Sequence, residues 1–199
     1  QPNAIVLDGE ATEVAGLRIW GIGDPRYTPN KEELSESETE QERADDYAPI
    51  VADRLAEDEP PEADVVMVHD RRTAADLGGE VPLVLAGHGH NPREDRLGDD
   101  TLVLTEGSTG GAGLRGLQGE EPEPLTASIL YFDPETRELV AFDRITVLGA
   151  GETGATIDRH VIADERPGED ETTTSPTTST TTTSATATTT SVTTTTTTG

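Results

Sequence analysis

Two continuous apolar runs constrain the fold of this chain more than any other feature of its sequence. They span residues 63–69 and 81–88, and neither shows the alternation of apolar and polar side chains that is typical of a half-buried strand. Such runs indicate strands that are buried on both faces of a parallel sheet and covered by helices. The sequence therefore predicts an α/β fold. Each run ends in a histidine, His69 or His88.

The residues before the first run predict a strand followed by a helix. Residues 17–23 form a short apolar run that ends in glycines, which is typical of a buried strand that enters a loop. From residue 35 to residue 57 the pattern is helical, with Ser37 and Glu40 spaced as a capping box. Its apolar side chains recur every three or four residues: Ala44, Tyr47, Ala48, Val51 and Leu55. The helix is expected to end before Pro60.

The second half of the chain predicts mainly antiparallel strands. Apolar or alternating runs cover residues 101–105, 126–132, 138–147 and 156–163, with turn residues between several of them. Between the two histidine-ended runs, residues 73–77 have room for only a turn or two of helix before a pair of glycines.

We expect one domain followed by a tail. Residues 1–163 form the domain, residues 164–171 an acidic linker, and residues 172–199 a tail of Thr, Ser and Ala that has no apolar pattern and is expected to be disordered. The tail resembles O-glycosylated stalks, which favours an extracytoplasmic or cell-envelope location. Because residues 4–9 predict a strand only a few positions after Gln1, we also expect that a segment precedes this chain.

The charge of the chain excludes several partners. The formal net charge is −26, with 14 Lys and Arg against 40 Asp and Glu. A nucleic-acid-binding protein needs a clustered basic face, and a chain with this balance offers neither DNA nor an anionic membrane a matching surface. The absence of cysteine excludes disulfides, thiol nucleophiles and Cys-ligated zinc. No run approaches the roughly 20 apolar residues of a membrane span.

The same acidity predicts a dependence of stability on salt. The net charge of −26 makes the folded domain repel itself in dilute buffer. Salt screens this repulsion, since the Debye length falls from about 10 Å at 0.1 M to about 3 Å at 1 M. We expect the melting temperature to rise between about 0.1 and about 2 M NaCl. A flat or falling melting temperature in calorimetry would mean that the carboxylates are paired locally.

Three of the four histidines gather at the predicted strand ends. His88 and His90 are two residues apart among small glycines, and extended backbone would turn both side chains to one side. If the strands before His69 and His88 are neighbours, the three imidazoles meet at the carboxyl edge of the sheet, where α/β proteins place ligands. Imidazole suits Zn, Mn, Fe or Ni, so a metal site is predicted. His160, near the tail, is expected to lie on the surface.

These motifs carry a resemblance to a known family. His69-Asp70, the Gly-His-Gly-His sequence at 87–90 and the Glu-Gly-Ser-Thr-Gly-Gly sequence at 106–111 resemble the carboxyl-terminal half of a calcineurin-like metallophosphoesterase of the actinobacterial kind. The resemblance covers residues 1–163. It implies an αββα two-sheet sandwich that binds two divalent ions (Mn, Fe or Zn). In this family the ions activate a water that attacks a phosphoester.

The resemblance assigns metal-binding roles to three histidines, but other residues of the family's active site have no counterpart in this chain. It implies that His69 and His88 bind the second metal ion and that His90 binds the first. The amino-terminal motifs of the family, which supply the bridging carboxylate, an Asn ligand and the acid histidine, have no counterpart here. Tyr27 stands where the second Asp of one such motif belongs. No catalytic residue is therefore visible in this fragment, and we expect the chain alone to be inactive.

Four further residues are candidates to line the cleft. They are Asp24, Arg26, Asp70 and Ser108. Asp24 and Arg26 could instead form an ion pair within their loop. The alternative for Asp70 is a role in a turn, and the alternative for Ser108 is a role in a tight glycine-rich loop. The substrate would be an unidentified phosphoester, and the oligomeric state is left open. The alternative function is a non-catalytic, acidic, extracytoplasmic interaction module on a Thr-rich stalk, with histidines that are incidental or hold a single ion.

Overall fold

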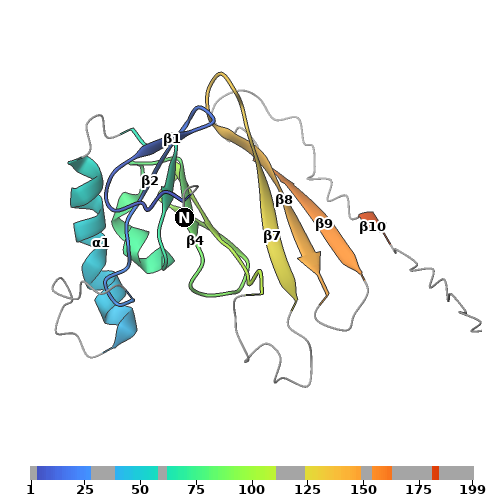
Figure 1. Cartoon of the computed structure of the whole chain (residues 1–199), viewed down its shortest axis with the longest axis horizontal. Helices are drawn as coiled ribbons and strands as arrows, with labels where there is room; N and C mark the ends of the chain where they lie inside the picture. Colours follow the sequence, from blue (N-terminus) through green and yellow to red (C-terminus); the bar gives the residue numbers. More distant parts are fainter. Residues whose placement is uncertain are drawn as a thin grey trace, which may run out of the picture.

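A computed structural model describes most of the predicted domain. The described residues are 4–27, 39–57, 62–110, 124–148, 154–162 and, for the backbone alone, 181–183. This part of the chain contains one α-helix, one 3-10 helix and two β-sheets. The helices lie on one side of the first sheet and the second sheet lies on the other (Figure 1). The α/β class predicted from the sequence is confirmed.

The first sheet is mostly parallel. Its strands are β1 (Thr12–Val14), β2 (Leu17–Gly21), β3 (Val65–Met67), β4 (Leu83–Ala86), β5 (Arg93–Leu97) and β6 (Thr101–Thr105), in the order β1-β2-β3-β4-β6-β5. The four central strands are parallel, and β1 and β5 pair antiparallel at the two edges. The two histidine-ended runs form β3 and β4, which are neighbours, so the loops that follow them meet at one edge.

The second sheet is antiparallel. It contains β7 (Leu125–Phe132), β8 (Leu139–Val147), β9 (Ala155–Val161) and β10 (Thr181–Thr183), in the order β10-β9-β8-β7. The short strand β10 falls inside the tail that was predicted to be disordered, and Thr181 pairs with Ile157 of β9. The acidic linker and the rest of the tail lie outside the described residues.

The helix α1 (Glu40–Ala56) begins at a capping box, although not the one predicted. The Thr39 hydroxyl accepts a hydrogen bond from the Glu42 backbone at 3.1 Å, and the Thr39 backbone donates to the Glu42 carboxylate at 3.1 Å. Ser37 lies outside the described residues. The predicted apolar face is confirmed, because the buried residues of α1 are Ala44, Tyr47, Ala48, Val51 and Leu55.

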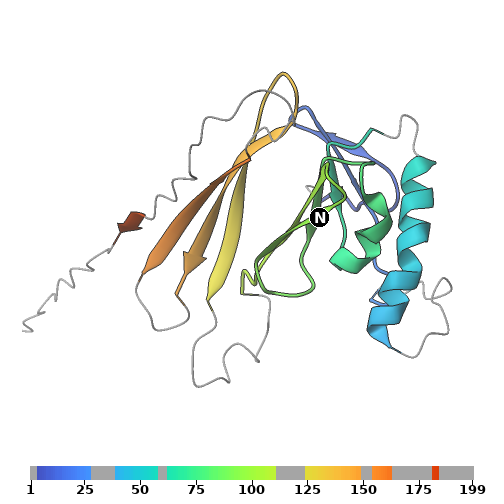
Figure 2. The same cartoon turned by 180° about the vertical axis from the view of Figure 1, so that it is seen from behind.

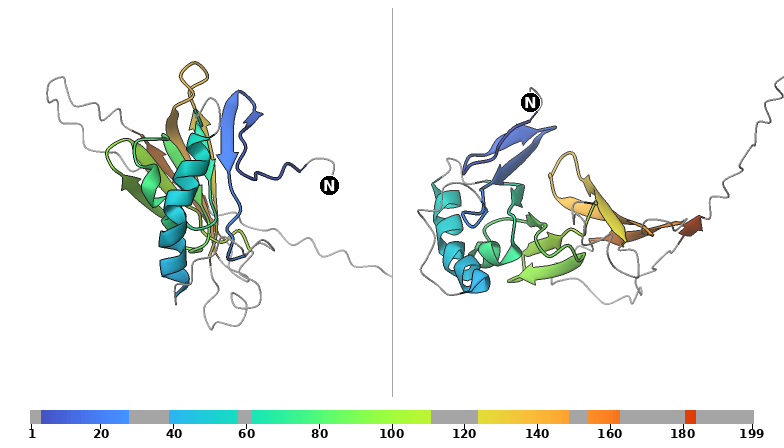
Figure 3. Two further views of the ribbon diagram at one scale, coloured as in Figure 1. Left: turned by 90° about the vertical axis from the view of Figure 1, so that its left-hand side faces the viewer. Right: turned by 60° about the horizontal axis from the view of Figure 1, so that its bottom comes forward.

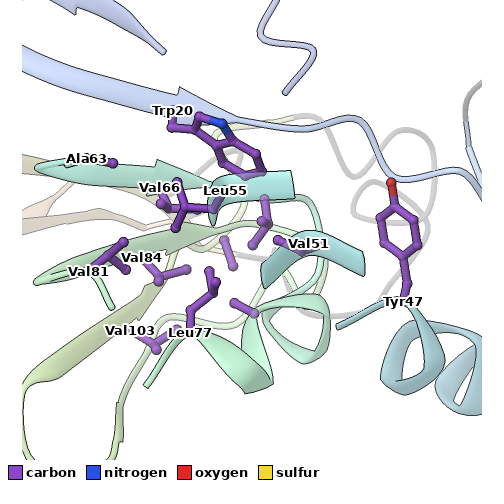
Figure 4. Close-up of a cluster of buried hydrophobic side chains, with 13 residues drawn as sticks. Trp20, Tyr47, Val51, Leu55, Ala63, Val66, Leu77, Val81, Val84 and Val103 are labelled. Atoms are coloured by element: carbon purple, nitrogen blue, oxygen red, sulfur yellow. The ribbon is translucent and has the colours of Figure 1, made fainter. Parts of the chain in front are cut away.

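The main core lies between the first sheet and the two helices. The second helix is the 3-10 helix η1 (Arg71–Leu77), which begins where the Asp70 side chain accepts from the Arg72 backbone. Trp20 of β2 packs with side chains of α1 and η1 over the centre of the sheet (Figure 4). The buried members from the sheet include Val66, Val84 and Val103.

A second core joins the two sheets. Phe142 of β8 is fully buried and packs against Val65, Leu83, Leu102 and Leu104, which project from the opposite face of the first sheet. Helices, first sheet and second sheet therefore form three layers, as the views from behind and from other directions also show (Figures 2 and 3).

The outer face of the second sheet is apolar and exposed. Ile129, Ile157 and Val161 are 47%, 47% and 72% exposed, and all three project away from the first sheet. On the same face, Arg159 donates two hydrogen bonds to Asp143, at 2.6 and 2.7 Å, and these lower the pKa of Asp143 to about 2. No helix in the described ranges packs on this face.

Three local features differ from the sequence analysis. Residues 4–9 form no strand, although the Gly9 backbone donates to the Gly21 carbonyl at 2.9 Å. The charged strand β5 was not predicted. His160, which was predicted to lie on the surface, is only 34% exposed, because its ring stacks on Phe142 with centroids 4.5 Å apart and its Nδ1 lies 3.2 Å from the Glu94 carboxylate. Among the described helices, none has the length and apolar character needed to cross a membrane.

Candidate functional site

The loops after β3 and β4 are tied together by their backbones. The His69 carbonyl accepts hydrogen bonds from the Gly87 backbone at 3.1 Å and from the His88 backbone at 2.8 Å. The Val68 backbone donates to the Leu85 carbonyl at 3.0 Å, which extends the pairing beyond the regular strands. The two histidines are therefore held side by side at the carboxyl edge of the sheet, as the sequence predicted.

The imidazoles of His69 and His88 are in direct contact. Nε2 of His69 lies 2.9 Å from Nδ1 of His88, and the ring centroids are 4.7 Å apart. Tyr27, in the loop after β2, places its ring 4.8 Å from the His69 ring and 5.7 Å from the His88 ring. We name the contact between the two histidines the His69–His88 pair. Sequence reasoning noted Tyr27 only as a departure from a family motif that supplies metal ligands, and that position was the one signal that could have placed it beside the pair.

The surroundings of His69 favour its neutral form. Partial burial lowers the pKa of His69, and the charge of His88 lowers it further, while nearby Asp24 and Asp70 oppose this effect. Imidazole binds a metal ion only in its neutral form. The pair therefore presents two ring nitrogens, and the environment keeps one of them unprotonated over a wider pH range than an isolated histidine would.

His90 lies in a different conformation from the one expected. The backbone of residues 87–90 is a turn rather than extended, with a hydrogen bond of 3.4 Å from the His90 backbone to the Gly87 carbonyl. His90 is exposed and has a φ of 51°, in the left-handed region. The argument that alternation turns His88 and His90 to one side was therefore wrong, because it requires extended backbone. That His90 joins the pair on one ion stays a prediction.

Three of the predicted cleft residues form one buried ion cluster. Nε of Arg26 donates to Asp24 at 2.9 Å, and Nη2 of Arg26 donates to Asp70 at 3.0 Å. The side chains of Arg26, Asp24 and Asp70 are only 5%, 4% and 9% exposed. Nη1 of Arg26 donates to the Glu40 carbonyl at 2.8 Å, which connects the cluster to the start of α1. We name these three residues the Arg26 cluster.

The charges in this cluster stabilise one another. Hydrogen bonds to Asp24 raise the pKa of Arg26 above its ordinary value. Burial alone would raise the pKa of Asp70, but the hydrogen bonds from the Arg72 backbone and the Arg26 side chain lower it below its ordinary value. The Asp70 carboxylate is therefore ionised at neutral pH, and both carboxylates already have the Arg26 guanidinium as a partner.

Ser108, the fourth predicted cleft residue, holds a loop. Its hydroxyl accepts from the Gly110 backbone at 3.2 Å, and its carbonyl accepts from the Thr126 backbone at 2.9 Å. The residue is buried and connects the end of β6 to the start of β7. Its contacts support the loop interpretation that the sequence left open.

A pocket of about 580 Å³ opens beside the His69–His88 pair, at the carboxyl edge of the first sheet. His88 lines it, together with the first residues of α1 and side chains from η1, β5 and β6. Four arginines belong to its wall: Arg26, Arg71, Arg72 and Arg93. Sequence reasoning missed the last three because they come from separate elements, and only the fold brings them together.

The described residues bring two imidazole nitrogens together but no larger set of potential metal ligands. Within the described ranges, no three His, Asp or Glu side chains are placed so that they could hold one ion together. Comparison with known proteins adds no relative: no protein-family model matches the chain, and no curated protein matches it. The class that fold and site define is therefore an α/β protein with two stacked sheets and a histidine pair at the carboxyl edge of the parallel one.

Proposed function

We propose that this chain is the histidine-bearing part of a metal-dependent phosphoesterase, and that it is inactive by itself. The observation that carries the proposal is the distance of 2.9 Å between Nε2 of His69 and Nδ1 of His88 at the ends of adjacent parallel strands. When bound at such a site, divalent ions activate water and hold the oxygens of the phosphate.

The pair fits one divalent ion. At 2.9 Å the two nitrogens share a hydrogen bond, in which one ring carries the proton between them. Bonds from imidazole to zinc are about 2.0 to 2.1 Å long, so both nitrogens would bind one ion after this proton leaves and the rings turn to bring them about 3.3 Å apart. The two carboxylates nearest to the pair in the Arg26 cluster are engaged by a guanidinium. The described residues thus provide ligands for one ion, and the second ion of the proposed centre needs further ligands.

The layers of the fold also support the proposal. A sheet face that carries exposed Ile129, Ile157 and Val161 is a face that folded proteins normally cover. The described part of the chain covers the outer face of the first sheet with helices and leaves the corresponding face of the second sheet bare. This is the arrangement expected of an αββα sandwich whose fourth layer is not among the described residues.

Cobalt binding tests the proposal. We expect the chain to bind Co²⁺ with an absorption band that reports nitrogen ligands, and we expect His69→Ala and His88→Ala each to weaken binding about tenfold or more. Titrations at about 1 M NaCl, where the Debye length is about 3 Å, suppress weak binding to the many surface carboxylates.

His160→Ala is the matched control, because this histidine also lies beside a carboxylate but sits between the sheets, away from the pair. Equal affinities in the wild type, His69→Ala and His88→Ala would contradict the proposal. That result would favour the alternative, a non-catalytic acidic interaction module whose histidines are incidental.

A further inference from the structure

The pocket beside the His69–His88 pair concentrates positive charge in a strongly acidic protein. Four of the 14 cationic side chains of the chain line it, although the net charge of the chain is −26. Arg71 and Arg72 are consecutive residues of η1, and Arg93 comes from β5, where it donates to Asp95 at 2.8 Å, the carboxylate that Arg71 also approaches. The remaining arginine of the wall belongs to the Arg26 cluster and has its partners already.

Arg71 and Arg72 are held only loosely. Nη1 of Arg71 lies 3.5 Å from Asp95, and Nη1 of Arg72 lies 3.6 Å from Asp45. These distances are at or beyond the limit of a hydrogen bond, and both side chains are more than a third exposed. A guanidinium has five N–H donors, so each of these arginines can turn donors toward a ligand while it keeps its ion pair.

A buried hydroxyl in the pocket wall lacks a partner. Thr105, at the end of β6, is 5% exposed, and its Oγ1 makes no hydrogen bond within the described residues. The side chain shares the helix-covered face of the sheet with Val103, which places it in the wall of the pocket. A buried hydroxyl without a partner is costly. The Thr105 oxygen has almost no accessible surface, so a ligand in the pocket would accept its hydrogen bond after the side chain rotates.

The start of α1 adds to the same preference. Thr39, Glu40 and Gln41 line the pocket, so the amino-terminal end of a 17-residue helix faces it. The backbone dipoles of a helix give this end a partial positive charge, which the carboxylates of Glu40 in the pocket wall and Glu42 in the capping box partly offset. Guanidinium groups, a hydroxyl donor and a helix amino terminus together form a set of donors that an oxyanion would satisfy.

We infer that this pocket binds a phosphate group of the substrate other than the one that is cleaved. The inference about the substrate rests on the proposed function, since His88 belongs both to the metal-binding pair and to the wall of the pocket. The substrate class is then a small molecule with at least two phosphate groups. One group lies at the pair, and the other is held by Arg71, Arg72 and the Thr105 hydroxyl. A volume of about 580 Å³ is within the range of ligand pockets and has room for such a compound.

Pyrophosphate binding in the absence of metal tests the pocket by itself. With EDTA present and at a constant ionic strength of about 0.15 M, calorimetry should detect binding of pyrophosphate to the wild-type chain. Arg71→Gln and Arg72→Gln should each weaken it about fivefold or more, because each removes a charge-assisted donor.

Arg137→Gln is the matched control. Arg137 is also half exposed with a single long ion pair, at 3.4 Å from Asp64, but it lies outside the pocket. It should leave the dissociation constant within about twofold of wild type. No binding by the wild-type chain, or the same loss in Arg137→Gln as in the two pocket variants, would overturn the inference.

Thr105→Val separates ligand binding from stability. Valine has a similar shape and no hydroxyl, so the melting temperature should stay the same or rise, while pyrophosphate binding weakens several-fold. A lower melting temperature with unchanged pyrophosphate affinity would overturn the role of the hydroxyl.

His69→Ala distinguishes the two proposals, because His69 belongs to the pair but not to the pocket wall. If it loses Co²⁺ and keeps pyrophosphate, both proposals are supported. If the wild type binds pyrophosphate but not Co²⁺, the proposed function fails and the anion pocket stands. If the wild type binds Co²⁺ but not pyrophosphate, the inference about the pocket fails and the proposed function stands.

Discussion

Replacement of Phe142 by alanine is expected to lower the free energy of unfolding by about 3 to 5 kcal/mol. The side chain is fully buried and is the large residue of the second sheet at the centre of the core between the sheets. Its ring also stacks on His160 at a centroid distance of 4.5 Å. Alanine would leave a cavity that Val65 and Leu104, held in the first sheet, cannot move to fill.

Urea denaturation followed by circular dichroism measures this effect. Ile129→Ala is the matched control, because this residue lies on the neighbouring strand but on the outer face, where it is 47% exposed. It should cost less than about 1.5 kcal/mol, since half of its surface is already in water. If both variants lose the same small amount, the second sheet does not pack on the first in the way described.

The parallel strands could be predicted because burial on both faces leaves a clear mark in the sequence. The runs that became β3 and β4 are apolar, since helices cover one face and the second sheet covers the other. Residues 101–105 were predicted among the mainly antiparallel strands of the second half, but they form β6, which pairs parallel with β4, so that prediction was wrong for this strand. The face of α1 was predicted residue by residue for the same reason. In each case the apolar pattern appears in the sequence because every residue on the buried face of the strand or helix contacts the core.

The strand β5 could not be predicted because its environment imposes no such pattern. Its sequence, Arg-Glu-Asp-Arg-Leu, is almost entirely charged, and it pairs only with β6 at the edge of the sheet. Charged residues are common on edge strands, where they prevent pairing with other chains. Backbone hydrogen bonds to β6 hold the strand, and these leave no signal in the side chains.

The positions of site residues could be predicted where regular strands determine them, and could not be predicted where loops determine them. His69 and His88 follow neighbouring strands, so the sheet alone brings them together. His90 is one turn further on, and a local backbone conformation decides where its side chain lies. The arginines of the pocket come from η1 and β5, which are adjacent only in the folded protein.

The Arg26 cluster gives the second large prediction: Arg26→Met should lower the free energy of unfolding by about 3 to 5 kcal/mol at pH 7. The variant removes the only charged partner that Asp24 has among the described residues and one of the groups that lower the pKa of Asp70. Both carboxylates stay buried, since their side chains are 4% and 9% exposed. Methionine fills much of the space of the arginine chain, so the loss reports mainly the unpaired charges.

The variant should also reverse the pH dependence that the cluster gives to the protein. In the wild type the pKa of Asp70 lies below that of the unfolded chain, so its contribution to stability is present above about pH 4 and is lost as the pH falls through the folded value. In Arg26→Met, burial is no longer offset by the guanidinium, and the folded pKa rises. The difference in stability between wild type and variant should therefore be largest near pH 7 and should shrink as the pH falls toward about 4.

Denaturation curves at several pH values measure this difference, and two further variants make the result specific. Arg137→Met removes a half-exposed arginine whose ion pair with Asp64 is 3.4 Å long, and it should cost less than about 1 kcal/mol at every pH. Adding Asp24→Asn to Arg26→Met removes one of the stranded charges and should recover part of the loss at pH 7. A loss for Arg26→Met that stays constant from pH 7 to about pH 4 would mean that the arginine contributes by packing and not by pairing the buried carboxylates.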